Sequence, residues 1–219
     1  MNDRLDPRLD PAATDYVLST TRSVRRRLDL ERPVEREVVL DCLRLAIQAP
    51  TASNRQMWRW LVVDDPQVRE GVAALYAEET VPRIQRRRAR TEDPQTLRVL
   101  DSAMHLTEVL ARVPVLLVPW LAERTDAPRP TPPVAFYGSI FPAIWSFQLA
   151  LRSRGMGSAL TTPFGSRLEP RYRDLLGLPH ESTPIALLPV AYTVGDEFKP
   201  ARRPPVEEIV RWNRWSDDA

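Results

Sequence analysis

The sequence predicts an α+β fold in which helices flank a small central sheet. Two features of the 219 residues support this prediction. Long segments with apolar residues at helical spacing alternate with short, wholly apolar runs, and the helical segments outnumber the runs. Because long segments separate the runs, the strands are few and the helices pack around them. The chain is long enough for one sizeable core, so residues 1–219 are expected to form a single domain.

The first half of the chain shows four helical segments and one strand. Residues 35–48 carry a wide apolar stripe that Pro50 ends, and residues 51–54 follow as a polar turn. The apolar run at residues 60–63, closed by two aspartates and a proline, is typical of a buried strand. The other helices are expected at residues 10–22, 67–90 and 94–111.

The second half holds the most apolar segments. Residues 115–121 are expected to form a strand, and four prolines within residues 122–134 favour a loop. Residues 136–152 are apolar on almost every side, which predicts a helix buried all round, with Ser139 as its N-cap and Pro142 in its first turn. A short strand near Thr161, a helix at residues 171–176 and a strand at residues 184–194 complete the prediction.

The two ends of the chain differ from its middle. Residues 1–12 are charged and contain prolines, so we expect a flexible N-terminus without a signal peptide. Residues 196–219 form a C-terminal arm in which three prolines precede an amphipathic piece with Trp212 and Trp215. Two large indoles after such a linker need an apolar partner surface, which indicates dimerisation.

Composition excludes several classes of function. An apolar fraction of 43% and a charged fraction of 27% are typical of a soluble protein, and no apolar run approaches the ~20 residues that span a bilayer. The single cysteine, Cys42, can form no internal disulfide. We therefore expect a cytoplasmic protein without a membrane partner. The net charge of +2 argues against a nucleic-acid binder.

The side chains that usually perform catalysis are scarce. His105 and His180 lie at no metal-ligand spacing, so no metal is expected, and the only lysine, Lys199, lies in neither a Schiff-base nor a phosphate-loop context. Gly155-Met156-Gly157 starts like a dinucleotide fingerprint, but it follows a helix and lacks the third glycine, which favours a helix-ending turn. Such a chain either binds a ligand or takes its chemistry from a cofactor.

Three polar segments could hold such a cofactor, although each has an ordinary alternative. Two guanidiniums and a hydroxyl in Arg22-Ser23-Val24-Arg25 suit a phosphomonoester, or they form a solvated basic turn. The small residues 50–54 could lie flat against a ring, or they only end a helix. The pair Arg202-Arg203 could bind an anion, or it belongs to an exposed linker.

Taken together and in this order, these segments resemble the nitroreductase family of flavoproteins. The family pattern combines an arginine–serine segment, an A-P-[ST]-x-x-N-x-Q-x-W turn, G-[LM]-G-S, T-T-P, L-G-L-P, V-x-x-G and a closing basic R-x-P. The matching residues are 22–25, 49–58, 155–158, 161–163, 176–179, 190–195 and 203–205. No single motif is specific, but seven in register cover nearly the whole chain.

The resemblance implies a nitroreductase-like α+β fold, an intertwined homodimer and FMN at the subunit interface. It places Arg22, Ser23 and Arg203 on the FMN phosphate, and Arg25 near the ribityl chain and the pyrimidine edge. The C-terminal arm would wrap the partner subunit. A cation at that edge would favour the anionic reduced flavin.

The resemblance also assigns contacts to the flavin ring. Thr161 and Thr162 would supply hydrogen-bond donors near N5 and the dimethylbenzene side. One face would be lined, from the other subunit, by Pro50, Thr51, Ala52 and Asn54. No side chain is expected to be catalytic, because the cofactor carries the chemistry.

The implied activity is hydride transfer from NAD(P)H to FMN and then, in a ping-pong cycle, to a small electrophile such as a nitroaromatic or a quinone. Alternatives within the family are dehalogenation, flavin fragmentation or a biosynthetic dehydrogenation. Another alternative is a protein that binds flavin without turnover. Neither the natural acceptor nor the preference between NADH and NADPH can be predicted from the sequence.

Some positions depart from the family pattern. Thr21 stands where many members have an arginine, Ala52 replaces a glycine or serine, and Met57 replaces a proline. These changes affect the expected phosphate and ring contacts more than the expectation of a flavin. The basic residues 83–90 either form a solvated helix face, as charge runs usually do, or meet the 2′-phosphate of NADPH.

Overall fold

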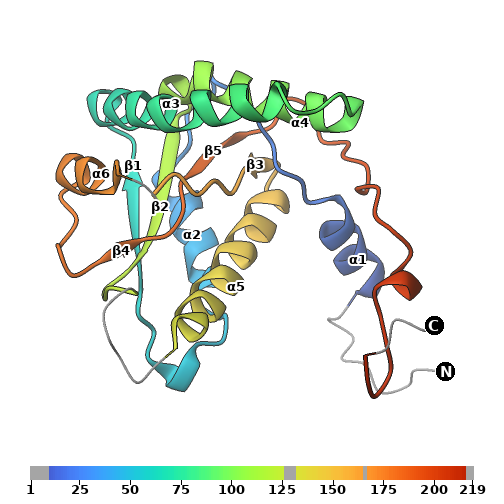
Figure 1. The fold of residues 1–219 in the computed structure, drawn as a ribbon. Coiled ribbons are helices and arrows are strands. Elements are labelled where there is room, and N and C mark those ends of the chain that lie inside the picture. The colour runs from blue at the N-terminus through green and yellow to red at the C-terminus, as the bar shows by residue number, and fades with distance from the viewer. Residues whose placement is uncertain (1–9, 126–131, 165–166, 216–219) are drawn as a thin grey trace. The chain divides into compact units, whose positions relative to one another are not determined.

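A computed structural model describes residues 10–125, 132–164 and 167–215 of the chain (Figure 1). The chain divides into two compact units. One unit comprises residues 22–196 and holds the sheet, and the other comprises residues 1–21 and 197–219. The smaller unit contains helix α1 (Pro11–Thr20) and the short 3₁₀ turn η3 (Val206–Glu208). Each unit is described by itself below.

The larger unit contains a five-stranded sheet in which every pairing between strands is antiparallel. Its main path runs β1 (Trp58–Val63), β2 (Val115–Leu121), β5 (Leu188–Tyr192) and β3 (Met156–Ser158). The short strand β4 (Thr183–Pro184) pairs with the end of β2. The small sheet and its surrounding helices confirm the predicted α+β class.

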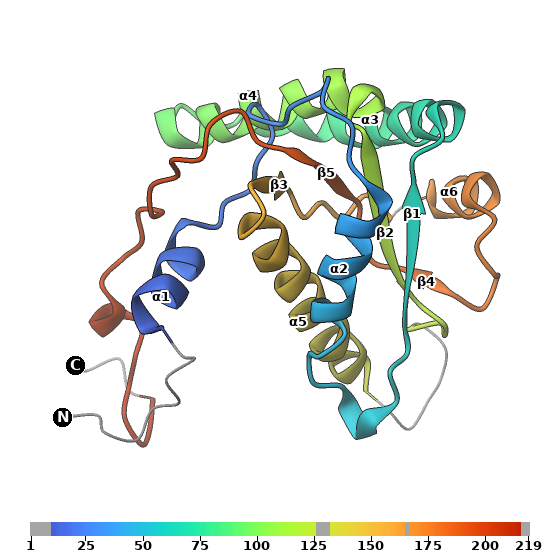
Figure 2. The ribbon, with the colours of Figure 1, turned by 180° about the vertical axis from the view of Figure 1, so that it is seen from behind.

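Strand β2 is buried on both faces of the sheet. Val115 and Leu117 belong to the core that the sheet shares with α2 and α5, whereas the alternating residues Leu116 and Val118 point to the opposite face. This explains why the strand is a continuous apolar run rather than an alternating one. Figures 1 and 2 show α3 and α4 on one side of the sheet and α2 and α5 on the other.

The helices of the larger unit agree with the predicted segments to within a few residues. Helix α3 packs against α4 and α6, and α2 packs against α5. Their bounds are α2 (Arg36–Ala46), α3 (Pro66–Arg88), α4 (Pro94–Val109), α5 (Pro133–Arg152) and α6 (Glu169–Leu176). Two 3₁₀ turns, η1 (Ala52–Asn54) and η2 (Leu110–Arg112), connect them to the strands.

The prediction for the start of α5 is wrong. The helix begins at Pro133 after Pro132, because proline suits the first helical turn, where its missing N–H has no intrahelical partner. Ser139 therefore lies inside the helix, not at its N-cap, and its Oγ donates to the carbonyl of Ala135 at 2.6 Å. Pro142 likewise lies in the helix interior rather than in the first turn.

The composition of α5 predicted a helix buried on every side, but one part of its surface is exposed. Tyr137 and Trp145 are 38% and 41% exposed in the single chain. By length and composition alone, α5 is apolar enough to span a bilayer, which is also true of many core helices. Half of its most apolar stretch is buried inside the fold. Its exposed aromatic side chains leave an apolar face uncovered within the part of the chain that the structure describes.

Three other predicted segments differ from the structure. The short strand lies at Met156–Ser158 instead of near Thr161, which makes only an isolated bridge with Leu187. The apolar run at residues 184–194 is divided, because it supplies both the end of β4 and all of β5. The amphipathic piece of the C-terminal arm forms only the single turn η3, and Trp212 is 86% exposed. Most of the predicted loop at residues 122–134 lies outside the described residues.

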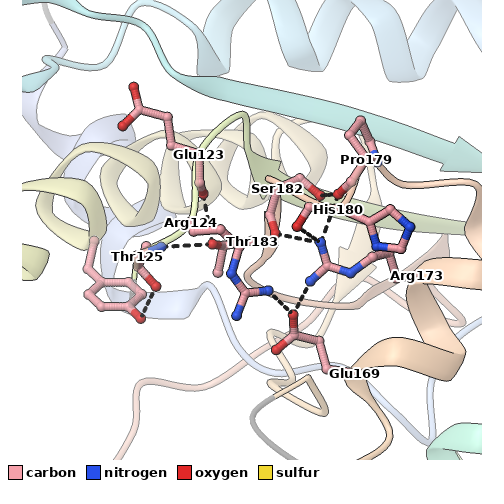
Figure 3. A network of polar contacts seen from close by, with 10 residues as sticks. Glu123, Arg124, Thr125, Glu169, Arg173, Pro179, His180, Ser182 and Thr183 are labelled. Atoms are coloured by element: carbon pink, nitrogen blue, oxygen red, sulfur yellow. Dashed lines mark hydrogen bonds and ion pairs between the residues drawn. The ribbon is translucent and has the colours of Figure 1, made fainter. Parts of the chain in front are cut away.

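A buried arginine fixes the loop between α6 and β4 (Figure 3). Arg173 is only 5% exposed, and its Nη1 donates to the carbonyls of Pro179, His180 and Ser182 at 2.6–2.9 Å. Its Nη2 contacts Glu169, which also pairs with Arg124. These bonds satisfy the backbone acceptors of an otherwise irregular segment, so this charge has a structural role.

Candidate functional site

The predicted phosphate-binding segment runs beside the edge strand β3. Ser23 forms a parallel bridge with Ser158, and the amide of Val24 donates to the carbonyl of Ser158 at 2.8 Å. Farther along, the amide of Val194 donates to the carbonyl of Arg27 at 2.9 Å. These bonds hold the segment against the edge of the sheet and therefore fix the backbone positions of Arg22 and Arg25.

Gly157 allows this close approach. A Cβ at this position would lie 2.8 Å from Cγ2 of both Val24 and Thr193. Gly157 therefore allows the segment at Val24 to lie against strand β3. Gly155, at φ +70°, adopts the left-handed conformation that ends the turn after α5.

Arg25, Tyr76 and Thr161 lie together although they come from three distant parts of the chain. Burial raises the pKa of the Tyr76 phenol, and interactions with Arg25 and with the hydroxyls of Thr80 and Thr161 oppose this rise. Burial also lowers the pKa of the Arg25 guanidinium. The structure thus joins two of the predicted flavin contacts, and it adds Tyr76, whose apolar surroundings in the sequence carried no functional signal.

The two arginines of the predicted flavin-binding segment have no carboxylate partner among the described residues. Arg22 and Arg25 are both partly buried, and neither forms an ion pair, whereas Arg36, Arg112 and Arg171 pair with acidic side chains. A partly buried guanidinium without a counter-charge is costly unless an anion completes the site. The Arg22 guanidinium and the Ser23 hydroxyl therefore fit a phosphate group, and Arg25 is left for another electron-rich part of the ligand.

The predicted ring-lining turn has a strained backbone. Ser53, Asn54 and Gln56 all have positive φ, between 48° and 53°, a region that costs a non-glycine residue about 1 kcal/mol or more. Side chains hold this conformation. The amide of Gln56 donates to Thr51 Oγ1 at 3.2 Å, and Gln56 Nε2 donates to Asn54 Oδ1 at 2.9 Å.

Helix α5 anchors the same turn. The amide of Ala52 donates to Ser139 Oγ at 3.0 Å. A small pocket lies beside this bond, lined by Thr51, Ala52, Arg55, Gln56, Met57, Leu121, Ala135, Phe136 and Ser139. The turn is therefore held in a fixed position beside this pocket, and Pro50 at its start is exposed.

The two groups of predicted contacts lie at opposite ends of α5. Ser139, near the start of the helix, holds the strained turn, whereas Gln148, near its end, donates to Ser158 Oγ at 2.9 Å beside the arginine segment. Nine residues separate these two anchors, which corresponds to about 14 Å along the helix axis. One chain does not bring the two groups together, as expected if the ring-lining turn serves the other subunit's site.

The remaining predicted contacts are placed as follows. Thr161 donates both its amide and its hydroxyl to the Leu187 carbonyl, at 3.1 and 2.7 Å, while the side chain of Thr162 is exposed. Arg203 is exposed in the smaller unit, and its contact with the FMN phosphate stays a prediction. Within the described residues, no three His, Cys, Asp or Glu side chains form a group that could hold a metal ion.

The family model for nitroreductases matches residues 18–192, which is most of the chain and includes both groups of contacts. The chain belongs to the nitroreductase family. The match confirms the resemblance inferred from the seven motifs, and it covers the entire larger unit up to the end of β5.

Among individual sequences, the chain is similar to iodotyrosine deiodinases and to a bacterial dehydrogenase. It is 28% identical over 199 residues to human iodotyrosine deiodinase 1, with 89% of this chain and 66% of that protein aligned. The NADH dehydrogenase of Thermus thermophilus is 28% identical over 206 residues, covering 87% of this chain and 91% of that protein. The chain thus spans less than two thirds of the human deiodinase.

Solved structures share the fold. An oxidized iodotyrosine deiodinase bound to FMN and 3-iodo-L-tyrosine superposes with a TM-score of 0.69 at 23% identity, covering 91% of this chain and 98% of that one. An FMN and NADPH-dependent nitroreductase from a Sphigopyxis strain gives a TM-score of 0.68 at 19% identity, with 92% and 99% covered. At these identities the likeness establishes the nitroreductase-like fold alone.

Proposed function

We propose that this protein is an FMN-dependent oxidoreductase that transfers hydride from NAD(P)H to a small electrophile. The observation that carries the proposal is the pair of partly buried arginines, Arg22 and Arg25, which lack carboxylate partners and flank Ser23 at the edge of the sheet. Two FMN-binding relatives share the fold, and the chain matches the family model along this segment.

In this proposal Arg22, Ser23 and Arg203 bind the FMN phosphate, and Arg25 lies by the pyrimidine edge of the ring. When bound, the flavin supplies the hydride acceptor and donor. Arg25 would stabilise negative charge on the reduced ring, and Tyr76, whose pKa Arg25 affects, lies near that guanidinium. Because Tyr76 is buried and its pKa is raised, it stays protonated at neutral pH.

We further propose that the protein works as a homodimer in which the turn at residues 50–54 of each subunit lines the ring in the other. Two observations support this. The turn lies at the opposite end of α5 from the arginines, and the packed pair α2 and α5 exposes large apolar side chains. These are Leu40, Leu45, Ile47, Tyr137 and Trp145. A second copy would bury them.

The proposed acceptor is a flat, apolar molecule such as a nitroaromatic or a quinone. Among the described residues the site offers no acid–base side chain apart from the buried phenol of Tyr76, and the pocket beside the turn has apolar lining from Met57, Leu121 and Phe136. Such a surface selects by shape rather than by a specific proton transfer, so broad acceptor specificity is expected.

A second candidate activity is reductive dehalogenation. It is favoured by the similarity to iodotyrosine deiodinases from animals and to one from the bacterium Thermotoga neapolitana, which is 27% identical over 203 residues and aligned over 97% of its length. Both candidate activities need the flavin, and they differ in the acceptor.

Purification and anaerobic mixing test the proposal. The purified dimer should be yellow or become yellow with FMN, and its flavin absorbance should bleach on addition of NADPH or NADH. Adding menadione or nitrofurazone under anaerobic conditions should restore the absorbance, and 3-iodotyrosine tests the second candidate. A protein that stays colourless after FMN addition, or whose bound flavin no nicotinamide reduces, would refute the proposed activity.

A further inference from the structure

The C-terminal end of α3 carries an open surface pocket whose lining is made only of arginines and threonines. The lining residues are Arg83, Arg86, Arg87, Arg90, Thr91 and Thr96. All four arginines are exposed, and none forms an ion pair within the described residues, although Arg88 on the same helix pairs with Asp101. Four guanidiniums around one concavity form a strong anion site.

Asp93, which lies between the lining residues Thr91 and Thr96 in the sequence, forms no ion pair with the four arginines of the pocket. Asp93 caps helix α4 by accepting from the amide of Thr96 at 2.7 Å, and its lowered pKa comes from hydrogen bonds to Thr96 and Gln95 rather than from any of the four arginines. One or two cations are enough to complement the free carbonyls of the last helical turn, and four arginines are present here. The surplus positive charge is available to a ligand.

This pocket and the candidate flavin site lie along the same side of α3. Tyr76, Thr80, Arg83 and Arg87 follow one another at intervals of four and three residues, so they share one side of α3, and Arg90 comes just after the helix ends at Arg88. The first two side chains are buried, and Arg83 still acts on the pKa of Tyr76. Arg83 and Arg87 lie about 10 and 16 Å along the axis from Tyr76.

We propose that this arginine pocket binds a phosphomonoester of the reductant, the 2′-phosphate of NADPH, and thereby makes the protein prefer NADPH to NADH. The inference rests on the proposed function. If the nicotinamide of NADPH stacks on the flavin ring beside Arg25 and Tyr76, the 2′-phosphate at the other end of the molecule must lie some distance from that ring. Arg83 and Arg87 lie on the same side of α3 as Tyr76 and supply positive charge at such a distance. Guanidiniums suit a dianionic phosphate better than the uncharged 2′-hydroxyl of NADH.

The test compares two variants of the FMN-loaded protein. In the double variant Arg83→Gln/Arg87→Gln, KM for NADPH should rise at least tenfold, with KM for NADH and kcat unchanged. The control is Arg88→Gln, which removes one positive charge next to Arg87 but outside the pocket, and should change neither KM. Equal effects on NADPH and NADH, or an unchanged KM for NADPH, would overturn the assignment.

A binding measurement separates this inference from the proposed activity. Adenosine 2′,5′-bisphosphate should bind the wild-type protein in calorimetry, and the double variant should bind it at least tenfold more weakly. ADP, which lacks the 2′-phosphate, should bind wild type at least tenfold more weakly than the bisphosphate. Equal binding of ADP, or no binding of the bisphosphate, contradicts the 2′-phosphate site. If the bisphosphate binds as expected but no nicotinamide reduces the flavin, only the proposed activity fails.

Discussion

The amide of Ala52 donates a 3.0 Å hydrogen bond to the Oγ of Ser139, and this bond ties a strained turn to the longest apolar helix. Ser139 is 8% exposed, and its own proton goes to the carbonyl of Ala135. The hydroxyl therefore serves both elements. Because the turn contains three non-glycine residues with positive φ, its shape depends on such external contacts.

Ser139→Ala should lower the free energy of unfolding by about 1–2 kcal/mol, because it leaves the Ala52 amide without an acceptor. It should also weaken FMN binding, since the turn loses its anchor. Urea unfolding and flavin titration measure the two effects. The control Ser153→Ala removes an exposed hydroxyl that bonds the carbonyl of Ala150, and it should cost less than about 0.5 kcal/mol. Equal stability of the two variants would show that the Ala52 bond contributes nothing.

Gly157→Ala should destabilise the protein by about 1–3 kcal/mol, because the new Cβ would lie 2.8 Å from Val24 and Thr193. Relief of this clash moves the segment that carries Ser23 and Arg25, so flavin content should fall as well. Thermal unfolding and the ratio of flavin to protein absorbance are the measurements.

Gly71→Ala is the matched control for this variant. Its Cβ would come equally close to another residue, at 2.9 Å, but that neighbour is the end of the exposed Leu175 side chain, which can move aside. Gly71 also lies inside a helix, where alanine is favoured by roughly 0.5–1 kcal/mol. The control should therefore be neutral or stabilising. A loss as large as that of Gly157→Ala would contradict the proposed cause.

Tyr172→Phe should leave stability at pH 7 unchanged or raise it by about 1 kcal/mol. The Tyr172 hydroxyl is buried without a hydrogen-bond partner, so its removal sacrifices no bond. Tyr192→Phe is the control, because that hydroxyl donates to Glu35 at 2.8 Å and its loss should cost about 0.5–1.5 kcal/mol. Urea unfolding at pH 7 distinguishes the two, and a larger loss for Tyr172→Phe would show that its hydroxyl is bonded after all.

The same tyrosine predicts how stability changes in alkaline solution. Burial raises the pKa of Tyr172 in the folded state well above its ordinary value, so the folded protein holds this proton more tightly than the unfolded chain. The contribution of Tyr172 to the free energy of unfolding is constant below the unfolded pKa of about 10. Above that pH the free energy of unfolding falls by up to about 1.4 kcal/mol per pH unit. Tyr172→Phe should therefore show a shallower decline between pH 10 and 11, and an identical decline would contradict this origin.

Much of the fold could be predicted from local patterns. Strand β2 is found at the predicted residues because residues 115–121 are apolar without interruption. The start of α5 was missed because the prolines at 132 and 133 looked like loop residues, although proline is also well suited to a first helical turn. The described part of the C-terminal arm forms little helix, since Trp212 and Trp215 are largely exposed and little apolar surface is buried there.

The candidate site could be predicted only in part. Arg22, Ser23 and the turn at residues 50–54 are found from motifs, because charged and small residues cluster there in sequence. Tyr76 could not be found in this way, since its role depends on α3 bringing it beside Arg25 and Thr161 from elsewhere in the chain. The same holds for Ser139, whose partner Ala52 is distant in sequence.

Arg22→Ala and Arg203→Ala should each weaken FMN binding by roughly tenfold to a hundredfold, the contribution of one charge-assisted hydrogen bond. If both side chains bind the same phosphate, the double variant should lose less than the product of the two single effects, because the contacts are coupled. Fluorescence titration of FMN gives the dissociation constants. Arg202→Ala, next to Arg203 and equally exposed, is the control and should change binding less than threefold. Independent, multiplicative losses would mean that the two arginines act on different parts of the ligand, and unchanged binding in both single variants would remove the phosphate assignment.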